Sequence, residues 1–199
     1  GVPLQVGFHR RFDEGFAEAR RLVASGEIGR LYAVRLHHNS NSVSPPGFLE
    51  SSGGLYRDSL AHDFDLLRWI SGQEVEEVYA AGAVLKGDDT LTRLGDIDTT
   101  EVLLRLADGA IASASSLRDN PHGYDARIEL HGSKDSVVSG VDMRTPIRFL
   151  SSDFGRGDQP VYQGFMDRFA QAYRDEIDVF LSVARGERES PCTGVDGRE

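Results

Sequence analysis

The stretch Gly53–Trp69 reads GGLYRDSLAHDFDLLRW, and the rest of the chain is interpreted around it. Its apolar residues recur at helical spacing: Leu60, Phe64 and Leu67. This period predicts an amphipathic helix that follows a glycine pair. Asp58 and His62 are four residues apart, so on a continuous helix their side chains leave one face, one turn apart. A carboxylate and an imidazole placed in this way can support proton transfer.

The composition is that of an ordinary globular protein: 199 residues, of which 39% are hydrophobic and 27% charged, enough for one large domain or two small ones. The net charge of −10 argues against nucleic acid as a partner, because phosphates need a basic surface. No apolar run approaches the ~20 residues that span a membrane, and the first residues lack a signal peptide. The single cysteine, Cys192, excludes an internal disulfide and a cysteine-based zinc site. We therefore expect a cytoplasmic enzyme or binding protein.

Periodicity and turn signals predict helices first, then a meander of strands, then a long helix. The expected helices are 13–26, 53–69 and 162–185, and the expected strands are 4–8, 31–38, 75–85, 99–106, 110–117, 124–131, 137–138 and 147–150. This order predicts an α+β fold, with a large, mostly antiparallel sheet and helices on one of its faces. No strand–GxGxxG–helix unit occurs in the sequence, so the usual dinucleotide-binding turn is missing.

Two apolar patterns bear on packing. The expected helix 162–185 carries a stripe that we expect to be buried in the core: Phe165, Phe169, Tyr173, Ile177, Phe180 and Leu181. In the expected strand 99–106, apolar residues alternate with others, but Leu103 gives the second face apolar character as well. An apolar open sheet face marks an interface, so a sheet domain that serves oligomer assembly is one interpretation of this chain.

Three blocks of the sequence carry a resemblance to a known family. They read VGFHRRFD…LVASGEIG (6–29), PPGFLESSGGLYRDSLAHDFDLLRWISG (45–72) and GYDARIELHGSKD (123–135). In order, spacing and content they resemble the Gfo/Idh/MocA family, the NAD(P)-dependent oxidoreductases of sugars and cyclic polyols, and in particular its inositol 2-dehydrogenase branch. The resemblance extends over nearly the whole chain.

The resemblance implies that residues 1–199 form a single α+β domain that binds substrate and supports oligomers. The family's N-terminal Rossmann domain, with its catalytic lysine, has no counterpart here, and its closing helix is cut short near Asp196-Gly197. The cofactor, NAD or NADP, would be held mainly by that missing domain. We therefore expect a dimer or tetramer that associates through the sheet face. The isolated chain is expected to be inactive.

The resemblance also assigns roles to single residues. Asp58 and His62 match the family's catalytic aspartate and histidine. Tyr124 and His38 match residues that contact substrate, and Arg10 matches an arginine near both the substrate and the nicotinamide. His62 is the candidate base, because imidazole titrates near neutral pH. Asp58 would hydrogen-bond the substrate hydroxyl or orient the imidazole.

One departure leaves the substrate open: Ser40 replaces the asparagine that the inositol branch has two residues after the histidine, and the loop that follows is longer. The sequence does not distinguish one polyol or sugar from another, nor NAD from NADP.

Other interpretations of the same residues stay open. Asp58 also fits a carboxylate near a helix N-terminus, where the helix dipole favours it. His62 also fits a hydrogen-bonded core histidine, and Tyr124 a packed strand aromatic. Arg10 also fits a simple ion-pair partner, and His38 a polar strand end.

The remaining acidic residues of the central helix have structural readings. Asp63 and Asp65 are interpreted as structural, capping the helix or pairing with Arg68. Divalent metal binding is a further alternative, because Asp58, His62 and Asp65 stand at i, i+4 and i+7. The pair Gly53-Gly54 is interpreted as a tight turn.

Overall fold

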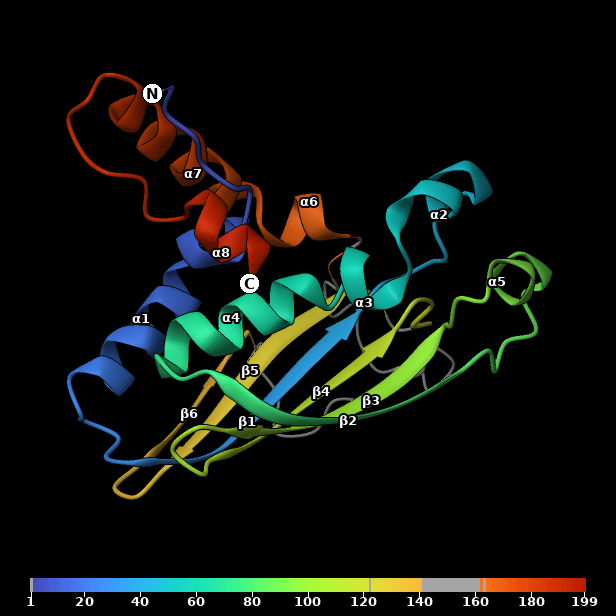
Figure 1. Cartoon of the computed structure of the whole chain (residues 1–199), viewed down its shortest axis with the longest axis horizontal. Coiled ribbons are helices and arrows are strands. Elements are labelled where there is room, and N and C mark those ends of the chain that lie inside the picture. The colour runs from blue at the N-terminus through green and yellow to red at the C-terminus, as the bar shows by residue number, and fades with distance from the viewer. Residues whose placement is uncertain (1, 122, 141–161, 163) are drawn as a thin grey trace, which may run out of the picture.

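The computed structural model describes residues 2–121, 123–140, 162 and 164–199. A six-stranded sheet forms one layer, and helices cover one of its faces (Figure 1). The strands are β1 (Leu31–Asn39), β2 (Val75–Ala83), β3 (Thr99–Leu106), β4 (Ile111–Leu117), β5 (Asp125–Gly132) and β6 (Ser136–Ser139). Their order is β2-β3-β4-β1-β5-β6, and of the neighbouring pairs only β1 and β4 run parallel. The predicted α+β fold with a mostly antiparallel sheet is confirmed.

The helices are short, and most of them lie before or after the run of strands. They are η1 (His9–Phe12, a 3-10 turn), α1 (Glu14–Ala24), α2 (Pro46–Ser52), α3 (Leu55–Asp58), α4 (Ala61–Ser71), α5 (Asp89–Leu94), α6 (Phe165–Arg168), α7 (Ala170–Ala184) and α8 (Gly194–Arg198). Among the residues that the structure describes, no helix has the length and hydropathy needed to cross a membrane.

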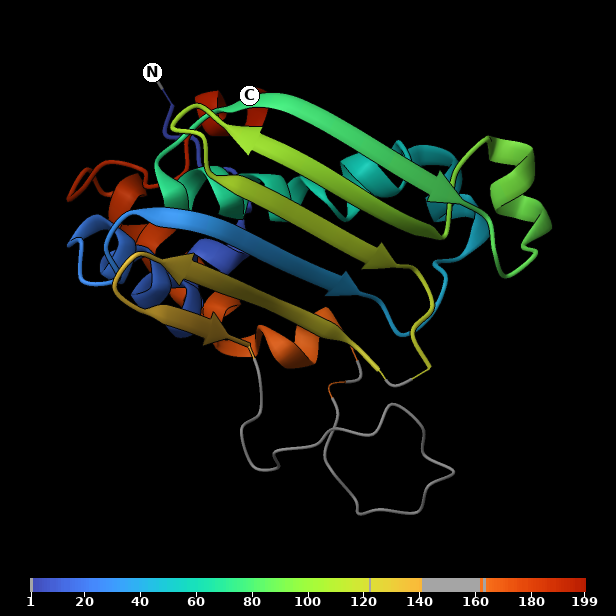
Figure 2. The ribbon, with the colours of Figure 1, turned by 90° about the horizontal axis from the view of Figure 1, so that it is seen from below.

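The core lies between the sheet and the helices α1 and α4. Strand β3 shows the alternation that builds it, because Val102, Leu104 and Leu106 are buried, whereas Leu103 is 53% exposed. Figure 2 looks onto the other face of the sheet, which none of the described helices covers. Apolar side chains therefore close one face of the sheet, and Leu103 lies on the open one.

The predicted helix 53–69 is broken into α3 and α4. The amides of Ser59 and Leu60 both donate to the carbonyl of Leu55, which widens the turn after Asp58 and ends α3. Ahead of α3, Gly53 and Gly54 have φ angles of 82° and 89°. These left-handed conformations suit glycine, so the predicted tight turn is confirmed.

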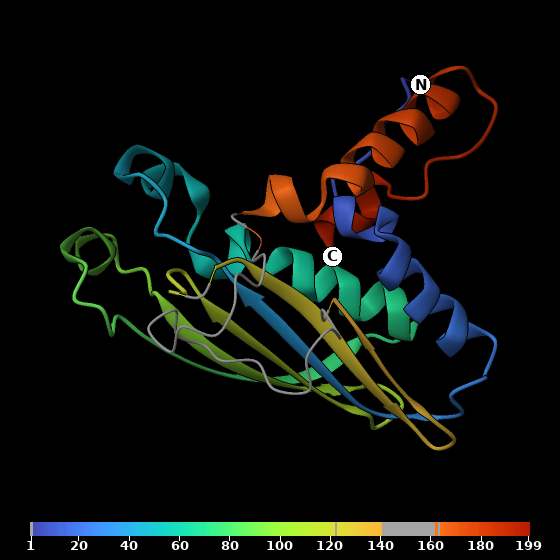
Figure 3. The same ribbon diagram turned by 180° about the vertical axis from the view of Figure 1, so that it is seen from behind.

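The predicted helix 162–185 is likewise two helices, α6 and α7, with a break at Phe169. Phe169 is buried, but Ile177 and Phe180 are 59% and 39% exposed, and Phe165 and Leu181 are also exposed. The prediction that the whole stripe is core is therefore wrong. The physical reason is the position of α7, which packs on η1 and stands away from the sheet (Figure 3). The expected strand 4–8 is wrong, because the amide of Val6 bonds the carbonyl of Cys192 and not a strand of the sheet. The expected strand 147–150 lies outside the described residues.

Candidate functional site

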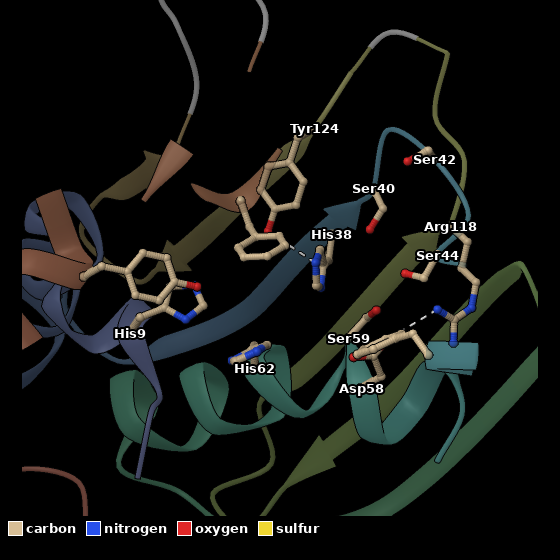
Figure 4. Close-up of a pocket in the computed structure, with 13 residues that line it drawn as sticks. His9, His38, Ser40, Ser42, Ser44, Asp58, Ser59, His62, Arg118 and Tyr124 are labelled. Atoms are coloured by element: carbon tan, nitrogen blue, oxygen red, sulfur yellow. Dashed lines mark hydrogen bonds and ion pairs between the residues drawn. The ribbon is translucent and has the colours of Figure 1, made fainter. Parts of the chain in front are cut away.

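A cavity of about 200 Å³ opens where α3 and α4 face the ends of β1 and β5 (Figure 4). Four of the five residues singled out from the sequence line it: His38, Asp58, His62 and Tyr124. The others that line it are His9, Ser40, Ser42, Ser44, Phe48, Ser59, Arg118, Phe165 and Tyr173. The fold therefore brings together side chains from five separated parts of the chain.

His38 and Tyr124 form one wall of the cavity and are hydrogen-bonded to each other. The Nδ1 atom of His38 lies 2.9 Å from a carboxylate oxygen of Asp63, and its Nε2 atom lies 3.3 Å from the Tyr124 hydroxyl. Burial and the nearby Arg10 lower the pKa of His38, so the ring is neutral. Because a carboxylate only accepts, Nδ1 carries the hydrogen, and the Tyr124 hydroxyl donates to Nε2. The phenol oxygen keeps lone pairs that can accept from a ligand.

Arg10, the fifth residue, lies behind this wall. Its guanidinium is 2% exposed and donates to Asp63 at 2.9 Å. Arg10 is absent from the cavity lining. It bonds Asp63, and Asp63 in turn bonds His38, which does line the cavity. Its predicted contact with substrate and nicotinamide stays a prediction. What the structure does assign to Arg10 is the charge that balances Asp63.

His62 projects from the first turn of α4, beside a second imidazole that the sequence analysis missed. The ring of His9 lies 4.9 Å from that of His62 and stacks on Tyr173. Among the described residues, Nδ1 of His62 and Nε2 of His9 are buried atoms without a hydrogen-bond partner. Burial is the main cause that lowers the pKa of each ring to about 3. The neighbouring His62 and Arg10 lower the pKa of His9 further, and Arg10 and His38 lower that of His62. Both are therefore neutral at physiological pH.

Asp58 faces the cavity from the end of α3, where its carboxylate accepts a hydrogen bond from Arg118 at 3.3 Å. The Nδ1 atom of His62 has no partner in the described structure, so Asp58 does not orient the imidazole through that atom. Arg118 in turn donates to Asp96 at 2.8 Å. The other predicted role for Asp58, contact with a substrate hydroxyl, stays a prediction.

The acidic residues interpreted as structural are both buried in ion pairs, although not with Arg68. Asp63 pairs with Arg10 and His38, and Asp65 pairs with Arg11. Arg68 pairs with Glu74 instead.

The alternative of a metal site is not supported by this geometry. The carboxylate of Asp65 is paired with Arg11, and that of Asp58 with Arg118. Over the ranges that the structure describes, no three His, Cys, Asp or Glu side chains come together in a way that could hold a metal ion. The spacing i, i+4, i+7 fails because the break at Ser59–Leu60 removes the common helical face.

Two lining residues, His9 and Arg118, carried little signal in the sequence. His9 lies in the 3-10 turn η1, and Arg118 lies directly after β4. Both are far in sequence from the central helix. The serines at 40, 42 and 44 do have a visible signal, because their alternate spacing lets an extended loop present all three hydroxyls on one side.

Comparison with known proteins decides the family. The model of the GFO/IDH/MocA C-terminal domain matches residues 16–138, which include the central helices and most of the sheet. The chain belongs to the GFO/IDH/MocA family. The predicted resemblance is thereby confirmed.

Individual GFO/IDH/MocA proteins are similar over almost the whole chain. The uncharacterized oxidoreductase YrbE of Bacillus subtilis is 39% identical over 99% of this chain and 57% of its own length. The myo-inositol dehydrogenase Hyg17 of Streptomyces leeuwenhoekii is 38% identical over 98% of this chain and 58% of its own. A crystal structure of scyllo-inositol dehydrogenase from Lactobacillus casei, with bound NAD(H) and scyllo-inositol, superimposes with a TM-score of 0.82, at 29% identity and over 98% and 58% of the two chains. The chain thus spans less than two thirds of each of these relatives.

Proposed function

We propose that this chain is the substrate-binding domain of an NAD(P)-dependent oxidoreductase that transfers hydride between a nicotinamide and a hydroxyl-bearing carbon of a cyclic polyol or sugar. The observation that carries the proposal is the cavity itself, in which a neutral imidazole, a carboxylate and a tyrosine hydroxyl face one space. Two comparisons with known proteins also support the proposal. The chain belongs to the GFO/IDH/MocA family, and it is similar to a dehydrogenase whose structure holds NAD(H) and scyllo-inositol. Activity would require the remaining part of the enzyme, and we expect the 199-residue chain alone to be inactive.

The residues present fit the reacting end of a nicotinamide cofactor better than its nucleotide end. Within the described ranges there is no glycine-rich turn between a strand and a helix that could cradle a pyrophosphate. At the cavity, the unpartnered nitrogens of His9 and His62 are polar atoms that a bound group can satisfy. When bound, the nicotinamide supplies the hydride acceptor or donor.

His62 would take the proton of the reacting hydroxyl. Its neutral ring presents a free lone pair, which a general base requires. Burial disfavours the imidazolium that results, so His62 is a weak base that holds the proton only briefly. Asp58 carries a negative charge on the same side of the cavity and can accept a hydrogen bond from the hydroxyl as it approaches. Tyr124 and His38 would hold another hydroxyl of the same ring.

The lining favours an uncharged ligand rich in hydroxyl groups. The serines at 40, 42 and 44 offer short hydroxyls that both donate and accept. Phe48 and Phe165 provide apolar surface for the faces of a carbon ring. This chain has Ser40 where inositol dehydrogenases are expected to have an asparagine. We therefore expect it to accept a different range of substrates from those enzymes, because Ser40 lines the cavity.

The direct test measures reduction of NAD and NADP by the full-length protein with a panel of inositols and monosaccharides. We expect turnover with at least one of them, and a loss of kcat of about 10²-fold or more in His62→Gln, the scale of a positioned acid–base group. The matched control is His131→Gln, because His131 lies on the open sheet face with Arg35 and Ser136 and outside the cavity. Turnover in His62→Gln equal to that of the control would remove His62 from the mechanism, and no turnover with any substrate would remove the proposed function.

A second function, oligomer assembly, is favoured by the open sheet face. Tyr79 and Leu103 are paired across β2 and β3, so their side chains lie together, and they are 71% and 53% exposed. Ile111 on β4 lies on the same face and is 44% exposed. We propose that this face meets a second copy of the chain. Light scattering of the full-length protein should give a dimer or tetramer that dissociates in Leu103→Glu, and a monomeric wild type would exclude this interface.

A further inference from the structure

Helix α3 places Asp58 in the cavity, yet it is only four residues long, Leu55–Asp58. A single turn costs more conformational entropy than its hydrogen bonds return, so it does not hold itself together. The position of Asp58 must therefore be set by contacts from outside α3, which are a hydrogen bond between Tyr56 and Thr100 and the contacts at its two ends.

Asp96 holds the first end. Its Oδ1 atom accepts a hydrogen bond from the backbone amide of Leu55 at 2.9 Å. Gly54 makes this approach possible, because a Cβ atom at that position would lie 3.1 Å from the same carboxylate oxygen. The φ of 89° at Gly54 is also one that other residues rarely adopt. The glycine before α3 and the carboxylate of Asp96 thus form one fitted contact.

Arg118 holds the second end and is fixed by the same carboxylate. Its guanidinium is 3% exposed and donates through Nη2 to Asp96 at 2.8 Å and through Nε to the carbonyl of Ile97 at 3.2 Å. The remaining Nη1 atom donates to Oδ2 of Asp58 at 3.3 Å. A buried arginine held by two other acceptors presents its third donor in a fixed direction.

We propose that Asp96 and Arg118 form a clamp that grips α3 at both ends and sets the position of the Asp58 carboxylate, which makes Arg118 a positioning residue for the reaction. This role rests on the proposed function, in which Asp58 meets the reacting hydroxyl. Arg118 engages Oδ2 of Asp58 and leaves Oδ1 without a bond to it, so the carboxylate presents one oxygen to the cavity. The clamp is built from residues that lie 38 and 60 positions beyond Asp58, which explains why the central helix alone does not reveal it.

The test is a double-mutant cycle in the full-length enzyme, with Arg118→Gln, Asp58→Asn and the double variant. A displaced catalytic group typically costs about 10²-fold, so we expect Arg118→Gln to lower kcat by that factor while KM changes far less. The double variant should be no slower than Asp58→Asn, because Arg118 acts only through Asp58. Arg118→Lys should restore part of kcat, since an ammonium replaces the charge but not the three fixed donors. Losses that multiply in the double variant would show that Arg118 acts independently of Asp58 and would overturn the proposal.

Two further measurements keep the outcomes distinct. Arg21→Gln is the matched control, because Arg21 also bonds two carboxylates, Glu18 and Glu27, but lies on the exposed side of α1. It should leave kcat unchanged. A crystal structure of Arg118→Gln tests the clamp without turnover, and we expect the Asp58 carboxylate to move. If the wild type turns over no substrate, the proposed function fails and the crystal structure still decides the clamp, which an unmoved Asp58 would refute.

Discussion

Acidification should destabilise this fold strongly between pH 7.5 and pH 5.0, because of the two imidazoles at the cavity. Burial lowers the pKa of both His9 and His62 to about 3. In the unfolded chain a histidine titrates near the ordinary value of about 6.5. Between those two values the unfolded state binds more protons than the folded state, so stability falls as the pH falls. The loss begins near pH 6.5 and continues down to the folded pKa.

The size of the effect follows from the same two values. At pH 5.0 a site that stays neutral when folded and has an unfolded pKa near 6.5 costs about 2 kcal/mol relative to pH 7.5. His9 and His62 together therefore cost about 4 kcal/mol, a large part of the roughly 5–15 kcal/mol that stabilises a typical domain. His38, whose pKa is lowered by burial and by Arg10, acts in the same direction. Arg10 and His38 outweigh burial to lower the pKa of Asp63, so its contribution is lost only at lower pH, outside this window.

Urea unfolding followed by the fluorescence of the single tryptophan, Trp69, measures this directly. The free energy of unfolding of the wild-type chain and of His62→Asn is compared at pH 7.5, 6.0 and 5.0. We expect the variant to lose about 2 kcal/mol less than the wild type across this range, and the double variant with His9→Asn about 4 kcal/mol less. Equal losses in the wild type and His62→Asn would mean that the folded protein accepts the proton without penalty. The argument from burial would then be refuted.

Three other perturbations have clear expected outcomes. Tyr124→Phe removes the hydroxyl that bonds His38 and faces the cavity, so steady-state kinetics of the full-length enzyme should show KM raised by about tenfold, the worth of one hydrogen bond; an unchanged KM would exclude the substrate contact. Gly54→Ala should lower the free energy of unfolding by about 1–2 kcal/mol because of its left-handed φ, whereas Gly47→Ala, inside α2 with open space around it, should be neutral or stabilising. Urea titrations that rank the two glycines equally would contradict this. In the same assay Phe169→Ala, at a buried ring, should cost about 3–5 kcal/mol and Phe180→Ala, at an exposed one, much less; similar losses would mean that the Phe180 side chain is covered.

The sheet was predictable because alternation within each strand encodes its two faces. The buried Leu104 and the exposed Leu103 follow each other in β3 as that pattern requires. The final helix was predicted less well for a related reason. Its apolar period shows that Phe180 and its neighbours form one face, but a period does not tell which part of the molecule covers that face. In the described structure α7 reaches η1, and most of the stripe stays exposed.

The candidate site was predicted in part, and by an argument that the structure changes. Asp58 and His62 were paired because four residues separate them on a continuous helix, yet the helix is broken between them. They still line one cavity, because the chain turns at Ser59–Leu60 instead of continuing straight. Arg118 and His9 were missed, since nothing in a local pattern tells that a charged or polar residue will be buried beside a group far away in sequence. Such contacts come from tertiary packing alone.

The charged groups around the cavity restrict the net charge that a bound ligand can carry. On one side, Arg10 and Asp63 are buried as a pair and cancel. On the other, the two carboxylates of Asp58 and Asp96 face the single guanidinium of Arg118, which leaves one negative charge beside neutral imidazoles. An anionic substrate, such as a sugar phosphate or a sugar acid, would meet repulsion in a buried setting where charges are poorly screened. A neutral ring meets no such repulsion, and one of its hydroxyls can donate a hydrogen bond to the Asp58 carboxylate. The electrostatics therefore favour an uncharged ligand, as the proposed function requires, over a charged sugar.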